Sequence, residues 1–244
     1  MSADGPFSVK FISIEGDIGS GKSTLVKELQ TALGENKEFM FIQEPVDEWE
    51  LICDDEGNSM LQKFYADQGR WAFAFQMMAY ISRLAILREA AAKADLLGVK
   101  YIVSERCVDT DRNVFAQMLY DEGKLDTAEF AIYKRWYDVF LKDIPVHARI
   151  YIETTPEICN ERVIKRARAG ETIPLGYLRK CHQYHESWVS EQESKGINVL
   201  RLNGNRDIFT DVEVMARWLS RIEDFLGDVD ITGKLTKTHS VIEC

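Results

Sequence analysis

The sequence lacks any segment typical of a membrane-spanning or exported protein. Its longest uncharged apolar run, residues 71–81, is well short of the roughly 20 residues that span a bilayer. The first ten residues contain neither the apolar core of a signal peptide nor an Arg-rich amphipathic stretch. We therefore expect a cytoplasmic protein with no membrane partner.

Cysteine is sparse, and its pattern argues against a disulfide framework and against a zinc site. The five cysteines are an odd number, and none of them forms a CxxC pair. This usage argues against a disulfide framework and favours reduced thiols. His182 and His185 are spaced to share a helix face, but no Cys or acidic residue accompanies them at zinc-site spacing. Surface or packing roles are therefore favoured over metal binding.

Basic residues are outnumbered by acidic ones. The chain has 30 Lys and Arg against 40 Asp and Glu, which gives a formal net charge of −10. A chain of this charge repels nucleic-acid polymers, so no such partner is expected. Hydrophobic residues make up 45% of the chain, which is enough for a full globular core.

Five short β-rich runs alternate with segments of helical periodicity. The runs cover residues 9–15, 39–43, 99–104, 147–153 and 197–202. Strands that alternate with helices predict an α/β fold with a five-stranded parallel sheet flanked by helices.

The longest predicted helix lies in an insert between the second and third strands. Residues 70–95 contain no Gly or Pro and predict a helix of about seven turns. Residues 111–121 and 125–142 predict two further helices, separated at a Glu-Gly pair. No linker divides the chain, so we expect a single domain over residues 1–226 and a polar tail over residues 227–244.

A phosphate-binding loop follows the first predicted strand. The motif GxxxxGK[ST] is matched without exception by Gly16, Asp17, Ile18, Gly19, Ser20, Gly21, Lys22 and Ser23, with Thr24 next. Such a loop wraps phosphates with backbone N–H groups, its Lys reaches the β/γ oxygens, and its Ser can bind Mg²⁺. A chance Gly-rich turn is the alternative, but a strand enters the motif and a helix leaves it. We therefore predict a P-loop NTPase fold.

Two acidic residues follow neighbouring predicted strands. Glu44 ends the second strand, and the Glu105-Arg106 pair ends the third. Ligands bind beyond the carboxyl ends of strands in open α/β sheets, so these side chains should face the phosphate loop. A carboxylate there can accept a proton from an attacking hydroxyl or hold Mg²⁺. Either residue alone would read as a surface charge.

A basic cluster follows the fourth predicted strand. Arg162, Lys165 and Arg166 share one helix face, and Arg168 precedes a flexible Ala-Gly pair. A solvated helix end is one interpretation. We favour a mobile lid over residues 162–173 whose arginines close over phosphates.

Taken together, these segments resemble the deoxynucleoside kinases, the group of deoxycytidine, deoxyguanosine and mitochondrial thymidine kinases. The resemblance spans residues 10–225 and rests on GDIGSGKS, EPVDEW, RWAFAFQ, ERCVDTDRNVFA, RVIKRAR, IPLGYL and HESW. It implies an ATP-dependent kinase that uses Mg²⁺, phosphorylates the 5′-hydroxyl of a deoxynucleoside in nucleotide salvage, and forms a homodimer. The dimer would pair the helices at residues 70–95 and 125–142.

The resemblance also implies roles for individual residues. Glu44 looks like the acceptor of the 5′-hydroxyl proton, Glu105 like the Mg²⁺-side carboxylate, and Arg106 like a contact of the 5′ oxygen, although either Glu could be the base. Ser23 and Glu105 would hold the metal. The donor would be bound by the phosphate loop, by Arg162, Arg166 and Arg168, and by a loop that includes Asp207 and Phe209. The nucleoside would contact Glu44, Trp49, Leu61, Tyr65, Phe75, Gln76, Arg83, Arg106, Asp111, Phe115 and Glu171.

Base preference follows from three of these residues. Gln76 resembles the residue that hydrogen-bonds the base edge, and Arg83 lies two helical turns further along the same face. In the family, an Arg-Asp pair at the positions of Arg83 and Asp111 crowds the thymine methyl. We expect deoxycytidine, deoxyadenosine or deoxyguanosine to be favoured over thymidine. An ordinary ion pair between helices is the alternative.

Two other functions fit part of the pattern. A nucleoside monophosphate kinase of the thymidylate kinase type shares the phosphate loop and lid, but it should need another basic site for the acceptor phosphate. A nucleotide-dependent switch of the GTPase kind should have a DxxG element directly after a strand and an NKxD guanine-binding element, and neither occurs. The sequence favours the deoxynucleoside kinase.

Overall fold

The computed structural model describes residues 7–140, 144–168, 171–206, 208 and 211–232. All five expected strands are present and form one parallel sheet. The strands are β1 (Lys10–Gly16), β2 (Phe39–Ile42), β3 (Tyr101–Glu105), β4 (Val146–Glu153) and β5 (Asn198–Asn203). Their order across the sheet is β2-β3-β1-β4-β5, so β1 is the central strand, with β3 and β2 on one side and β4 and β5 on the other. A crevice next to β1 is the expected ligand site for this order.

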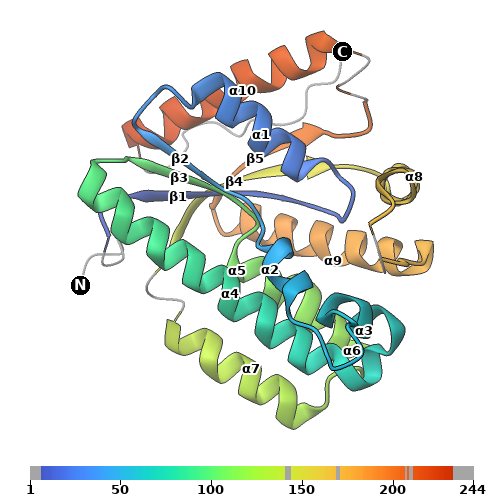
Figure 1. Cartoon of the computed structure of the whole chain (residues 1–244). Helices are drawn as coiled ribbons and strands as arrows, with labels where there is room; N and C mark the ends of the chain where they lie inside the picture. Colours follow the sequence, from blue (N-terminus) through green and yellow to red (C-terminus); the bar gives the residue numbers. More distant parts are fainter. Residues whose placement is uncertain (1–6, 141–143, 169–170, 207, 209–210, 233–244) are drawn as a thin grey trace.

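Helices cover both faces of the sheet (Figure 1). On one face, α1 (Lys22–Leu33) and α10 (Val212–Thr232) pack against the buried aliphatic side chains of β1, β4 and β5. On the other face lie α4 (Gln68–Leu97) and α9 (Leu175–Ser194). The remaining helices are α2 (Val46–Leu51), α3 (Met60–Ala66), α5 (Val108–Thr110), a π-helix (Asp111–Ala116), α6 (Gln117–Asp121), α7 (Thr127–Phe140) and α8 (Pro156–Arg166).

The long helix α4 confirms the prediction from the Gly- and Pro-free segment. Asp67 caps its first turn by accepting a hydrogen bond from the Arg70 N–H, and Gly98 ends it in a left-handed conformation. The helix extends the predicted range by two residues at each end. It packs beside α7, which was predicted over residues 125–142 and is described up to Phe140.

Two elements differ from the predictions. Residues 111–121 were expected to form one α-helix, but the Asp111–Ala116 part is a π-helix. Its wider turn occurs where Asp111 pairs with Arg83 and Phe115 lies under Arg106, so side-chain contacts outweigh regular helix geometry. In addition, α10 continues to Thr232, so its last turns include residues assigned to the polar tail. Within the described residues, no helix is both long enough and apolar enough to span a bilayer.

Candidate active site

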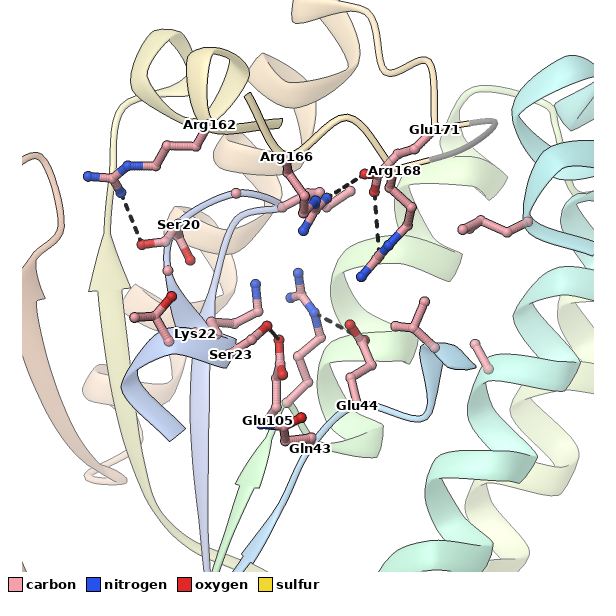
Figure 2. A pocket seen from close by; sticks show the side chains of 18 of the residues that line it. Ser20, Lys22, Ser23, Gln43, Glu44, Glu105, Arg162, Arg166, Arg168 and Glu171 are labelled. Carbon is pink, nitrogen blue, oxygen red and sulfur yellow. Dashed lines mark hydrogen bonds and ion pairs between the residues drawn. The ribbon is translucent and has the colours of Figure 1, made fainter. Parts of the chain in front are cut away.

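One cavity of about 590 Å³ opens at the carboxyl ends of the strands. The phosphate loop, α4, the π-helix and α8 all contribute to its wall, so segments far apart in the chain meet there. Figure 2 shows residues of the phosphate loop, strand ends and lid that face this cavity. The expected nucleoside contacts also line it: Glu44, Trp49, Leu61, Tyr65, Phe75, Gln76, Arg83, Arg106, Asp111, Phe115 and Glu171.

The phosphate loop connects β1 to α1 as expected. Its Gly19 has φ +88°, and a Cβ there would come within 2.5 Å of the Cys159 carbonyl oxygen, so only glycine fits. Lys22 donates from Nζ to the Asp17 carbonyl oxygen at 2.8 Å. Burial and the nearby Arg106 charge lower the pKa of Lys22 to about 8. Residues 18–24 line the cavity, whereas Gly16 and Asp17 do not.

Ser23 and Glu105 meet at the floor of this loop. Ser23 Oγ donates a hydrogen bond to Glu105 Oε1 at 2.8 Å (Figure 2). Hydroxyl and carboxylate oxygens are the ligand types that Mg²⁺ prefers, and Mg²⁺ usually takes only a few protein ligands beside phosphate oxygens and water. Among the described residues, no group of three or more His, Cys, Asp or Glu could hold a metal by itself. The donor set therefore fits an ion that is shared with a bound triphosphate.

Arg83 is the centre of a buried ion-pair network. Its guanidinium donates to Asp111 at 2.8 and 3.2 Å, and to Glu44 Oε1 at 2.6 Å. A further bond, to the Glu105 carbonyl oxygen at 2.9 Å, fixes the guanidinium against β3. Burial alone would raise the pKa of Glu44, but the charges of Arg83, Arg106 and Lys22 outweigh it and hold this pKa at about 2. Glu44 is therefore an ionised hydrogen-bond acceptor at neutral pH.

Arg106 reaches the same carboxylate from a strained backbone. Its φ is +63°, a left-handed conformation that costs a non-glycine residue about 1–2 kcal/mol. The Arg106 N–H donates to the Ile14 carbonyl oxygen at 2.9 Å, and Ser104 Oγ donates to the Arg106 carbonyl oxygen at 2.8 Å. Arg106 Nε lies 3.5 Å from Glu44 Oε1. Such strain is typical of residues that have to be aimed into a functional site.

Aromatic side chains form the compartment next to these charges. Phe75 stacks on Phe64 at 4.4 Å and meets Trp49 edge-on at 5.8 Å. Gln76 is buried beside them, and its Oε1 has no hydrogen-bond partner among the described residues. A flat apolar slot with one free amide oxygen suits a nucleobase, whose faces stack and whose edge hydrogen-bonds.

The lid residues are already engaged with the cavity wall. Arg166 pairs with Glu171 at 2.6 Å, and Arg168 lies 3.8 Å from the same carboxylate (Figure 2). Arg162 donates to the Ser20 carbonyl oxygen at 3.3 Å. Tyr65 and Glu171 both line the cavity. Burial and the Glu171 charge both raise the pKa of the Tyr65 phenol.

Some residues that line the cavity were not predicted, and two predicted donor contacts lie outside the residues that the structure describes. Asp207 and Phe209, expected near the donor base, lie outside the described residues. Their neighbours Gly204, Arg206 and Ile208 line the cavity, as does Trp218 of α10, which the sequence motifs did not single out. His182 and His185, expected to have surface or packing roles, both contact Asp17 of the phosphate loop.

Comparisons with known proteins agree with this geometry. A family model described as deoxynucleoside kinase matches residues 12–227. The chain is 36% identical to a probable deoxycytidine kinase of fowlpox virus over 228 residues, which are 91% of this chain and 90% of that protein.

Vertebrate relatives are similar over comparable lengths. The human deoxycytidine kinase is 32% identical over 244 residues, covering 90% of this chain and 92% of that protein. A mitochondrial deoxyguanosine kinase of Xenopus laevis is 32% identical over 250 residues, covering 93% of both. This chain therefore belongs to the deoxynucleoside kinase family, and it is an ATP-dependent kinase that transfers phosphate to a nucleoside hydroxyl.

Proposed function

We propose that the protein transfers the γ-phosphoryl group of Mg-ATP to the 5′-hydroxyl of a deoxynucleoside, with deoxycytidine, deoxyadenosine or deoxyguanosine favoured over thymidine. One observation carries the proposal. A single cavity joins the phosphate loop, the Glu44–Arg106 pair and an aromatic slot that contains Gln76. A donor phosphate, an attacking hydroxyl and a nucleobase each find suitable chemistry there.

Ser23 and Glu105 would hold Mg²⁺ together with the donor phosphates. When bound, the ion supplies positive charge that offsets the charge developing on the phosphoryl oxygens. Lys22 stands beside this pair and would contact the same phosphates.

Glu44 orients the attacking hydroxyl. Because its pKa is about 2, it is a weak base, and it can accept the proton fully only after the alcohol oxygen has begun to bond to phosphorus and become acidic. This order suits the loose transition state of phosphoryl transfer, in which positioning and charge neutralisation do most of the work. Arg106 would neutralise charge at the 5′ oxygen. The lid arginines would neutralise charge on the donor phosphates when the lid over residues 162–173 closes. These arginines are Arg162, Arg166 and Arg168.

Base choice would depend on Gln76 and the Arg83–Asp111 pair. The free Oε1 of Gln76 can accept a hydrogen bond from an exocyclic amino group, which cytosine and adenine carry and thymine lacks. Arg83 is held by three partners and is 3% exposed, so it cannot move away to make room for the thymine methyl. Tyr65 and Glu171 would bind the sugar 3′-hydroxyl from the opposite wall.

Incubation of the pure protein with Mg-ATP and each deoxynucleoside in turn tests this function. Formation of monophosphate from deoxycytidine or a purine deoxynucleoside, with little from thymidine, is expected. Thymidine having the highest kcat/KM would refute the specificity argument. Turnover of monophosphates alone would point to a thymidylate kinase type of activity, and ATP hydrolysis that ignores added nucleoside would point to a switch.

Two further properties belong to this proposal. A homodimer is supported by exposed apolar side chains along α7 and α4, namely Ile132, Trp136, Val139 and Ile81, each about half exposed. A cytoplasmic location is supported by the thiols, since all four cysteines among the described residues are free. Fractionation of cells that produce the protein would test the location.

A further inference from the structure

Asp17 belongs to the phosphate loop, but its carboxylate contacts α9 instead of lining the cavity. The side chain is 1% exposed. Its Oδ2 lies 2.7 Å from His182 Nδ1, and its Oδ1 lies 2.9 Å from His185 Nδ1. The two histidines are three residues apart and so share one face of α9. The phosphate loop is thereby anchored to this helix.

His185 continues the connection to the other half of the site. Its Nε2 lies 3.1 Å from Arg106 Nη1. The imidazole is fully buried, lies nearly parallel to the Tyr151 ring at 6.4 Å, and meets Phe115 edge-on at 5.7 Å. The ring is therefore held in place while its two nitrogens face different halves of the cavity wall.

The neighbours of each nitrogen determine where the imidazole proton resides. Nδ1 hydrogen-bonds the Cys181 carbonyl oxygen at 2.9 Å and also lies 2.9 Å from Asp17 Oδ1, outside hydrogen-bond geometry; both oxygens can only accept. Nε2 faces a guanidinium, which only donates. These partners place a proton on Nδ1 and a lone pair on Nε2 directed at Arg106.

The buried Asp17 carboxylate needs positive charge or hydrogen-bond donors close by. Burial disfavours the ionised carboxyl, but the contacts with His185 and His182 outweigh it and lower the pKa of Asp17 to about 2. The hydrogen bond to Asp17 raises the pKa of His182. His182, which is a quarter exposed, can therefore supply positive charge beside Asp17.

We propose that His185 is a positioning residue that links the donor and acceptor halves of the site. Nδ1 steadies the phosphate loop through Asp17, and Nε2 holds Arg106, whose left-handed backbone needs support. The acceptor side of this inference rests on the proposed role of Arg106. No step of the reaction described above uses His185 directly.

Two substitutions separate the two links. In His185→Gln the amide oxygen can replace Nε2 as the acceptor for Arg106, whereas in His185→Asn the amide N–H can replace Nδ1 beside Asp17 and the Cys181 carbonyl. We expect kcat to be about tenfold lower in the Asn variant than in the Gln variant, because the Asn variant leaves the buried Arg106 guanidinium without this acceptor. The KM for ATP should show the opposite order. His182→Gln, which touches Asp17 but not Arg106, should change the KM for ATP and not kcat.

A purely structural role would lower kcat and raise KM in both variants in proportion to their loss of thermal stability, and that result would overturn the proposal. A second measurement needs only the wild-type protein. The ¹⁵N resonances of His185 at neutral pH should show an unprotonated Nε2, and a protonated Nε2 would overturn the proposal even in an active enzyme. Wild-type protein that phosphorylates no deoxynucleoside would refute the proposed function but leave this resonance test intact.

Discussion

The pKa values of single residues in the cavity are determined largely by burial and by neighbouring charges. Glu44 is buried but stays ionised because cations surround it, whereas Lys22 loses affinity for its proton because it is buried near Arg106. Their pKa values predict specific responses to pH and substitution.

Binding of Mg-ATP at alkaline pH should be accompanied by protonation of Lys22. In the free protein its pKa is about 8, so the ammonium is partly deprotonated above that value. Bound phosphates favour the charged form, so Mg-ATP binding at about pH 9 should take up a proton, and binding at about pH 7 should not. Calorimetry in buffers of different ionisation enthalpy measures this uptake. Lys22→Arg should abolish it, and equal uptake at both pH values would contradict this assignment.

Gln76 should determine nucleoside affinity and leave donor affinity alone. Gln76→Leu removes the hydrogen bonds to the base and is expected to raise the KM for deoxycytidine about 10–100-fold, since each such bond contributes roughly 1–3 kcal/mol. The KM for ATP should stay within about twofold. Gln30→Leu on the exposed side of α1 is the matched control. Equal changes in both KM values would argue against a base contact.

Sequence reasoning located most of the cavity-lining residues because their roles depend on motifs that are local in the chain. It missed the link between His182 and Asp17 because the two residues are 165 positions apart. A search for metal-site spacing cannot find a partner at that distance. Only the packing of α9 beneath the phosphate loop brings them together.

At the scale of elements, α8 ends within the lid, so the residue that terminates this helix is also a lid residue. Ala167 follows this helix with φ +49°, one of two non-glycine residues at positive φ among the described residues. The other, Arg106, is held by a network of contacts, whereas Ala167 has one backbone bond to the Val163 carbonyl oxygen. The left-handed conformation at Ala167 is therefore the easier of the two to relieve.

Ala167→Gly should stabilise the protein. Glycine adopts the left-handed conformation without a Cβ penalty, and after its higher unfolded-state entropy is included we expect a gain of about 0.5–1 kcal/mol in the free energy of unfolding. Chemical denaturation measures it. Ala92→Gly in the exposed middle of α4 is the control and should lose about 1 kcal/mol. A loss of stability at both positions would show that Ala167 is not strained.

The elements that were predicted least well are those in which tertiary contacts compete with local preference. Residues 111–121 have helical periodicity, and nothing in their pattern distinguishes a π turn from an α turn. The buried pair between Asp111 and Arg83 lies at that turn. By contrast, residues 70–95 of α4 contain no Gly or Pro, and Asp67 and Gly98 flank the helix as caps, so its approximate extent follows from sequence alone.

At the scale of the whole molecule, α7 should form part of a dimer interface. Ile132, Trp136 and Val139 lie at helical spacing and are each nearly half exposed. Trp136→Lys should weaken self-association about 30–1,000-fold, since buried interface tryptophans contribute roughly 2–4 kcal/mol. Sedimentation at micromolar protein should show twice 28.0 kDa for the wild type and for Leu51→Lys, a control on the exposed part of α2. A wild-type monomer would contradict the dimer.

The contrast between the overall charge and the cavity charge affects how fast the two substrates arrive. The chain carries a net charge of −10, yet the cavity is lined by nine Lys and Arg side chains against five carboxylates. Electrostatic steering should therefore guide a triphosphate to one place on an otherwise repulsive surface, while an uncharged deoxynucleoside arrives by diffusion alone. In stopped-flow measurements, the association rate constant of ATP should fall about tenfold between low salt and about 0.5 M salt, and that of the deoxynucleoside should hardly change. Equal falls for both ligands would mean that the cavity field does not govern encounter.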